Sequence, residues 1–306
     1  MNRRDCLKSI SATGAAAALP GLLSAQNDAK FAFKYVLAST MYGNMKLSRI
    51  LPELEHTGCE GLDIWCKPHG TQREEIDKMG VDSFAAMLKN YDAKALVFTC
   101  LPAGCYGLKP EMPVMQKLGG KIIVSSSPSV EILKGSETRA AVKKLIEEMA
   151  PHADEAAEHG LTIALKNGPG QVLSSPESIL HFGEFNRHPS LGIALAPQYL
   201  KKDILRIPEI ILELGNRNLS LIYLQEHGDG AFHKLQKTFE LEQLPGRGTL
   251  SYSVVAKALK LIEFSGYAEI SMYTTPRGLP ALEDSEQITE LINESRIYVD
   301  NCVRNL

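Results

Sequence analysis

The 306 residues lack five features that each mark a well-known class of protein. None of the six cysteines forms a C-x-x-C pair, which argues against a zinc knuckle. Neither G-x-G-x-x-G nor G-x-x-x-x-G-K-[ST] occurs, so a dinucleotide-binding or P-loop fold has no support. The net charge of −3 argues against a nucleic-acid-binding surface, which would need a basic face. After the N-terminal segment, no apolar run reaches the ~20 residues that a membrane span needs.

The N-terminal segment has the order of an export signal. Paired Arg3 and Arg4 are followed by Leu-Lys and then by a run of small apolar residues that ends at Ala25. This R-R-x-x-L-K order resembles twin-arginine export signals. We therefore predict a twin-arginine-like signal peptide over residues 1–25, a mature domain over 26–306, and a periplasmic or otherwise exported protein. The alternative is an amphipathic N-terminal helix.

The mature chain alternates short apolar runs with longer amphipathic stretches, such as 45–58 and 136–160, that end on glycine. Strands that alternate with helices predict a parallel sheet, and eight such units favour a closed (β/α)8 TIM barrel over an open sheet. The predicted strands are Phe33–Leu37, Gly61–Trp65, Ala95–Thr99, Lys121–Ser125, Leu161–Leu165, Leu191–Leu195, Leu219–Leu224 and Glu269–Tyr273.

Long polar segments follow the predicted strands, whereas short ones precede them. Residues 66–80, CKPHGTQREEIDKMG, follow one strand, and only EHTGCE precedes it. In a TIM barrel the functional site is built from the loops at the carboxyl ends of the strands. Lys166 comes directly after the strand LTIAL, so we expect its amine to lie at that site.

Four segments, in this order, carry a resemblance to a known family: GCEGLDIW (58–65), LTIALKNG (161–168), HPSLGIALAPQYL (188–200) and LPGRGTLSYSVVAKALKLIEFSGYAEISMY (244–273). They resemble the xylose-isomerase-like barrels of the sugar phosphate isomerase/epimerase superfamily. The resemblance implies a single barrel domain in which Asp63 matches a carboxylate near the substrate. It also implies a divalent cation, held by carboxylates and a histidine, that polarises a sugar during proton or hydride transfer.

The residues at the implied metal-ligand positions differ from the pattern of this family. The carboxylate and histidine positions of strands five to eight correspond to Lys166, Ala196, Gln198 or Tyr199, Tyr223 or Gln225, and Tyr273. An ammonium about 4 Å from a cation costs about 4 kcal/mol per unit charge at an effective dielectric of ~20. We therefore expect that the metal of the family is lost and that no other cofactor replaces it.

Three residues are candidate catalytic groups. Lys166 could clamp a hydroxyl, a carboxylate or a phosphate, or could form a Schiff base if burial lowered its pKa. An amine paired with Glu226 or Asp63 is the alternative. Glu226 and His227, with Asp229 in the same QEHGDG segment after the seventh strand and His233 nearby, form an acid/base cluster. These groups could also coordinate a metal in a new way. For His227, the alternative is a solvated loop side chain.

The candidate substrate-binding residues lie near the predicted strand ends. Trp65, the only tryptophan, could stack on a sugar ring or pack between barrel and helix. Arg247, in PGRGT, suits a carboxylate or a phosphate because its guanidinium bonds both oxygens. The full set is Asp63, Trp65, His69, Gln198, Tyr199, Arg247 and Tyr273.

These observations predict an exported barrel that binds or isomerises a carbohydrate-like small molecule without the divalent metal of its family. The alternative is a non-catalytic barrel that binds a carbohydrate or a partner protein. Phosphodiester cleavage agrees least with the sequence, because it needs several metals and a basic surface. The odd number of cysteines in the mature chain, all outside residues 1–25, also leaves a homo-oligomer open.

Overall fold

The computed structural model describes residues 31–306, so the predicted signal peptide lies outside the described residues. Eight parallel strands form a closed barrel in chain order, and the last strand pairs with the first. This confirms the (β/α)8 prediction. The strands are β1 (Lys34–Ala38), β2 (Gly61–Trp65), β3 (Ala95–Thr99), β4 (Ile122–Ser126), β5 (Thr162–Lys166), β6 (Leu191–Leu195), β7 (Leu219–Leu224) and β8 (Tyr267–Ile270).

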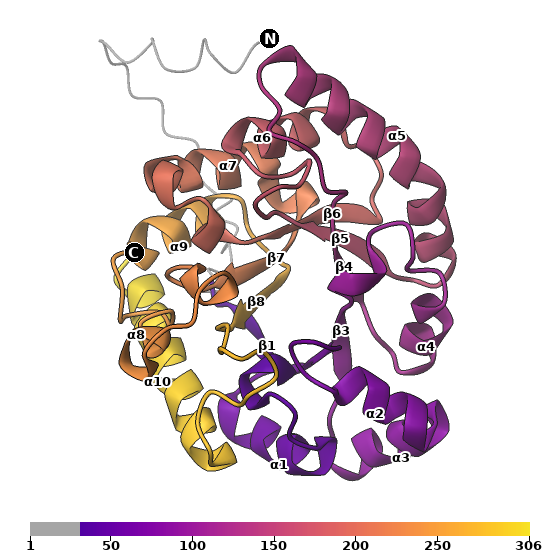
Figure 1. The fold of residues 1–306 in the computed structure, drawn as a ribbon, viewed down its shortest axis with the longest axis vertical. Coiled ribbons are helices and arrows are strands. Elements are labelled where there is room, and N and C mark those ends of the chain that lie inside the picture. The colour runs from indigo at the N-terminus through magenta and orange to yellow at the C-terminus, as the bar shows by residue number, and fades with distance from the viewer. Residues whose placement is uncertain (1–30) are drawn as a thin grey trace, which may run out of the picture. The chain divides into compact units, whose positions relative to one another are not determined.

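Helices surround the barrel, as the view along its axis shows (Figure 1). Within residues 31–306, none of them is both long and apolar enough to cross a membrane. The helices are α1 (Leu47–Thr57), α2 (Gln72–Met79), α3 (Val81–Asn90), α4 (Glu111–Lys117), α5 (Ser136–Glu158), α6 (Pro176–Phe185), α7 (Ile207–Asn218), α8 (Lys237–Leu241), α9 (Tyr252–Leu261) and α10 (Ser285–Arg304).

Local sequence explains where several helices begin and end. Helix α1 ends at Gly58, whose φ of 65° belongs to the left-handed region that glycine adopts without a steric penalty. Helix α6 begins with a capping box, because the side chain of Ser175 accepts a hydrogen bond from the backbone N–H of Ser178. This cap fixes the end of the loop that follows β5.

The predicted strand bounds differ from the observed ones at two places that matter for the site. Lys166 is the last residue of β5 rather than the first of a loop. Strand β8 ends at Ile270, so Tyr273, predicted as the last residue of that strand, lies in the segment beyond it. The prediction extended the apolar pattern of ISMY past the last residue that pairs with the neighbouring strands.

The barrel interior changes character from one end to the other. Apolar side chains from every strand fill much of it, in a cluster separate from the one between barrel and helices. Toward the carboxyl ends of the strands, Asp63, Lys166 and Glu269 are also buried. The register neighbours of Lys166 are Ser126 and Ala194, and these small residues leave space for its long stem. The polar part of the interior is therefore at the end where the functional site was expected.

Candidate functional site

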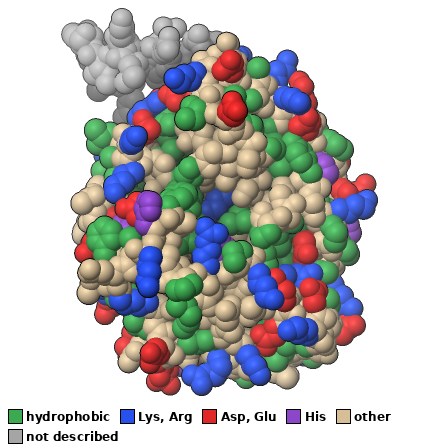
Figure 2. Space-filling model, in the orientation of Figure 1, with side chains coloured by type: hydrophobic (Ala, Val, Ile, Leu, Met, Phe, Trp, Pro, Cys, Tyr) green, Lys and Arg blue, Asp and Glu red, His purple; other side chains and the backbone are tan. Residues whose placement is uncertain are grey.

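A cavity of about 320 Å³ opens at the carboxyl ends of the strands. Figure 2 shows it as a hollow near the centre of the face, with basic side chains in and beside it. The last residues of β4 and β5 and the segments after β2, β3 and β5 to β8 contribute to the lining, which consists of Pro68, His69, Leu101, Pro102, Ser126, Lys166, Asn167, Gly168, Pro169, Gln171, Tyr199, Ala231, Phe232, Tyr273 and Arg277. Its walls are mainly aromatic and apolar, with a few polar groups, as is usual for small-molecule sites.

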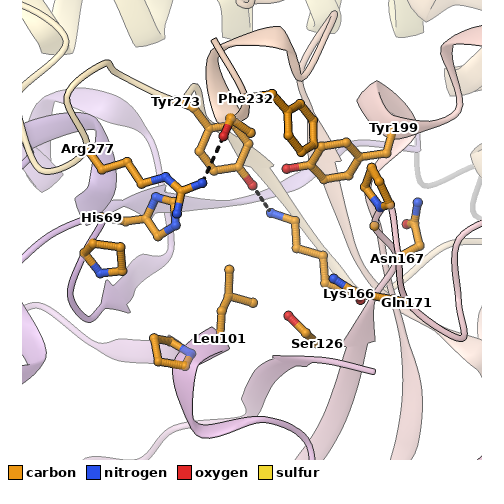
Figure 3. A pocket seen from close by; sticks show the side chains of 15 residues that line it. His69, Leu101, Ser126, Lys166, Asn167, Gln171, Tyr199, Phe232, Tyr273 and Arg277 are labelled. Atoms are coloured by element: carbon orange, nitrogen blue, oxygen red, sulfur yellow. Dashed lines mark hydrogen bonds between the residues drawn. The ribbon is translucent and has the colours of Figure 1, made fainter. Parts of the chain in front are cut away.

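The Lys166 amine lies at the inner end of this cavity. Only 3% of the residue is exposed, and its Nζ donates a hydrogen bond of 2.9 Å to the Tyr273 hydroxyl rather than to Glu226 or Asp63 (Figure 3). Nζ also lies 3.4 Å from the centroid of the Tyr223 ring. Burial lowers the pKa of the ammonium, although the nearby carboxyls act in the opposite direction. The site thus holds a desolvated amine whose nearest partners are aromatic.

Two carboxyls lie deeper in the barrel, below Lys166. Asp63 and Glu269 are fully buried and within hydrogen-bond reach of one another. One Asp63 oxygen accepts from the Thr99 hydroxyl at 2.6 Å, while the other three carboxyl oxygens have no donor. Burial raises the pKa of both groups, and the mutual repulsion of the carboxyls raises that of Glu269 further. A single proton shared by the pair would give these oxygens a donor, and it is the state that burial favours.

Sequence reasoning missed Glu269, although a signal was present. It is the only charged residue in Tyr267–Ile270, a strand that is otherwise buried or half-buried. A carboxylate at an inward position of a barrel strand needs a partner, and Asp63 is the one that the fold supplies.

Aromatic rings form the wall around the amine. The His69 ring lies 5.3 Å from both Trp65 and Tyr273, measured between centroids, and Tyr199 stacks on Tyr273 at 6.4 Å. Burial, together with the Arg277 and Lys166 charges, lowers the pKa of His69 to about 3, so its imidazole is neutral at physiological pH. Burial also raises the pKa of Tyr273 to about 12, which keeps its hydroxyl protonated.

Arg277 stands at the mouth of the cavity and was not among the predicted residues. Its guanidinium donates to the Ala231 carbonyl at 2.9 Å and points toward His69 (Figure 3). It belongs to TTPRGLP after β8, a segment that the sequence marks only as a long polar loop. A loop position of this kind carries no periodic signal, so only the fold could bring it to the cavity.

Asp63 and Trp65 lie behind Lys166 and do not line the cavity. Gln198 is buried too, where its amide donates to Gln225 at 3.1 Å. Among the predicted substrate-binding residues, His69, Tyr199 and Tyr273 do line it, together with Lys166.

The fold places Glu226, His227 and Arg247 outside the cavity lining. The Glu226 carboxylate accepts backbone hydrogen bonds from Gly246 at 3.0 Å and Leu250 at 2.7 Å, so it fastens the loop before α9.

The other two residues are also engaged elsewhere. The His227 ring stacks on Phe239 at 5.2 Å, and the exposed Arg247 pairs with Glu294 at 2.6 Å. These contacts favour structural roles for all three residues.

The side chains at the strand ends do not fit a divalent cation. Across residues 31–306, no group of three or more His, Cys, Asp or Glu side chains could hold a metal ion. At the two positions where the resemblance implies ligands, β5 ends with the Lys166 ammonium and β6 is followed by Ala196, whose backbone bonds to the Asn167 side chain. Beyond β8, Tyr273 offers a protonated hydroxyl that already accepts from Lys166.

Comparison with known proteins identifies the family of this chain and solved structures of similar fold. The pattern of the family described as xylose isomerase-like TIM barrel matches residues 51–293. No curated protein matches the chain. Among solved structures, the IOLI protein with a binding zinc atom is 16% identical, with a TM-score of 0.69 over 88% of this chain and 98% of that one.

Two sugar epimerases have similar structures. The D-allulose 3-epimerase from Methylomonas sp. in complex with D-allulose is 14% identical, covering 89% of this chain and 98% of that one with a TM-score of 0.65. The D-psicose 3-epimerase with D-tagatose from Clostridium cellulolyticum H10 is 11% identical, covering 88% and 99% with a TM-score of 0.67. At these identities the likeness establishes the fold.

Proposed function

Because the chain belongs to the family of xylose isomerase-like TIM barrels, we propose that it binds a carbohydrate-like small molecule in the Lys166 cavity without a divalent metal. The observation that carries the proposal is the buried ammonium at the inner end of an aromatic-walled cavity. Aromatic rings suit the apolar faces of a sugar ring, while Lys166 and Tyr273 can bond its hydroxyl or carbonyl oxygens.

The same geometry favours one chemical step. An ammonium held in a dry site is oriented before the ligand arrives, so it can stabilise negative charge that develops on a carbonyl oxygen. In the proposed isomerase or epimerase reaction Lys166 supplies this polarisation. His69 is the neutral group in the lining that could accept a proton, but its low pKa makes it a weak base.

The second candidate function is carbohydrate binding without turnover. It is favoured by the lining itself, which contains no aspartate or glutamate, and by the position of Glu226 and His227 outside it. Turnover assays on a panel of aldoses and ketoses, run beside calorimetric binding assays, separate the two candidates. Binding with no product formed supports the second, and product formation that Lys166→Gln abolishes supports the first.

We expect ligand binding, and any turnover, to persist in excess EDTA. The reason is that a cation at this site would meet the Lys166 ammonium instead of a carboxylate. Elemental analysis of the purified protein should find substoichiometric divalent metal, and added Mn²⁺ should not increase affinity. Loss of binding on chelation, restored by Mn²⁺, would contradict the proposal.

We also propose that residues 1–25 direct export through the twin-arginine route, on the basis of the R-R-x-x-L-K order. Changing Arg3 and Arg4 together to lysine should retain the full-length precursor in the cytoplasm, because the route recognises the arginine pair rather than its charge. Cell fractionation and immunoblotting measure this. The matched control is Lys8→Arg, which also keeps the charge and should be exported normally.

A further inference from the structure

The cavity lining carries charge of one sign. Lys166 and Arg277 contribute positive charge, and the other lining residues are neutral, since the His69 imidazole is not protonated at neutral pH. The charged side chains in and beside the hollow seen in Figure 2 are therefore basic, within walls that are otherwise apolar or neutral. A neutral sugar would offer this charge no partner, whereas an anionic group on the ligand could pair with it.

The two cations differ in whether nearby carboxyl groups compensate their charge. Lys166 faces the fully buried Asp63 and Glu269, which together carry one negative charge when they share a proton. That charge balances the ammonium from within the barrel. Arg277 makes no ion pair with any carboxylate of residues 31–306, and its one side-chain hydrogen bond there goes to the Ala231 carbonyl. The cavity thus presents one uncompensated positive charge, at its mouth.

The positions of the two cations indicate how a bound ligand would be oriented in the cavity. Lys166 comes from the end of β5, deep in the site, and Arg277 from the exposed loop after β8. His69 and Tyr273 lie between the two cations (Figure 3). Both are close enough to Arg277 that its positive charge acts to lower the pKa of each side chain. A ligand that reaches Lys166 with a hydroxyl or carbonyl would extend past these rings toward Arg277.

We infer that the ligand is a sugar acid: a carbohydrate with one carboxylate, which Arg277 binds at the mouth while Lys166 bonds an oxygen at the inner end. The planar guanidinium can bond both carboxylate oxygens at once. A phosphate ester carries a charge of about −1.5 to −2 at pH 7, and its additional charge would meet no third cation in this lining. This inference rests on the proposed function.

Isothermal titration with matched ligands tests it. The probes are glucose, glucuronate and glucose 6-phosphate, and the corresponding galactose series. The acid should bind about 10-fold or more tightly than its neutral sugar, as expected for charge-assisted hydrogen bonds. It should also bind more tightly than the phosphate ester, and its advantage should shrink as ionic strength rises.

An arginine variant locates the charge that the acid recognises. Arg277→Gln should remove the preference for the acid, so that the acid and its neutral sugar bind with about equal affinity. The side chain is exposed, so the substitution should not affect folding. The matched control, Arg304→Gln, changes an exposed arginine at the end of α10, outside the cavity lining, and should keep the preference.

Each remaining outcome contradicts either the sugar-acid inference or the proposed function. Equal affinity for the acid and the neutral sugar would overturn the inference and leave the proposed function standing. Tighter binding of the phosphate ester, or a preference for the acid that survives Arg277→Gln, would also overturn it. No binding of any member of either series would contradict the proposed function itself.

Discussion

Lys166→Gln is expected to weaken ligand binding by roughly 10- to 100-fold, the range for losing a charge-assisted hydrogen bond in a desolvated site. Glutamine keeps a polar group at the end of β5 but removes the ammonium and shortens the reach toward Tyr273. Unlike Arg277→Gln, the substitution should weaken binding of neutral and acidic sugars alike, because Lys166 contacts the part that both share. Isothermal titration against the same matched ligands measures the effect.

Two controls make this result interpretable. Lys109→Gln changes a lysine that is 75% exposed and pairs with Glu155. This variant should therefore bind the ligands with the affinity of the wild type. Circular dichroism and the unfolding midpoint show whether the Lys166 variant keeps its fold. A folded variant with unchanged affinity would mean that the ligand does not contact the amine, and the proposed site would then be wrong.

The barrel could be predicted because the pattern of apolar residues in the sequence is periodic. Short apolar runs separated by amphipathic helices leave few alternatives to a closed parallel sheet, and the predicted end of the fifth strand falls one residue before Lys166, where β5 ends. Strand β8 shows the limit. The apolar pattern continues through Met272 and Tyr273, whereas pairing stops at Ile270, and no local signal records where pairing stops.

The site was predictable only where strands fix the direction of side chains. His69, Tyr199 and Tyr273 meet Lys166 because each follows closely on a strand of the barrel. Glu226 follows β7 just as closely, but its carboxylate turns to the backbone of the loop before α9, which the sequence does not reveal. Arg277 reaches the cavity from a loop, where neither period 2 nor period 3.6 indicates direction.

Glu269→Gln is expected to make the folded protein increasingly more stable than the wild type as pH rises. Burial, with the charge of Asp63, raises the pKa of Glu269 well above its ordinary value, so the folded state retains a proton that the unfolded chain releases. The stability linked to this proton is fully present below the unfolded pKa and is lost as pH rises through the folded pKa. In that window each pH unit costs the wild type about 1.4 kcal/mol.

Glutamine cannot ionise, so the Glu269→Gln variant does not lose this stability as pH rises. Asp63 then remains as the only carboxyl that faces the Lys166 ammonium in the barrel, and the two charges balance. Urea unfolding at several pH values between about 5 and 8 measures the difference in unfolding free energy between variant and wild type. The control, Glu60→Gln, changes an exposed glutamate just before β2 and should unfold with the pH dependence of the wild type.

The comparison also tests the charge state on which the sugar-acid inference depends. If both carboxyls were ionised in the wild type, the pair would carry two charges, and one would oppose an incoming carboxylate. The difference in stability between variant and wild type would then not change across the window, since Glu269 would hold no additional proton in the folded state. A difference that grows by about 1.4 kcal/mol per pH unit is instead the slope of a single retained proton. That slope would leave Arg277 as the uncompensated charge of the cavity.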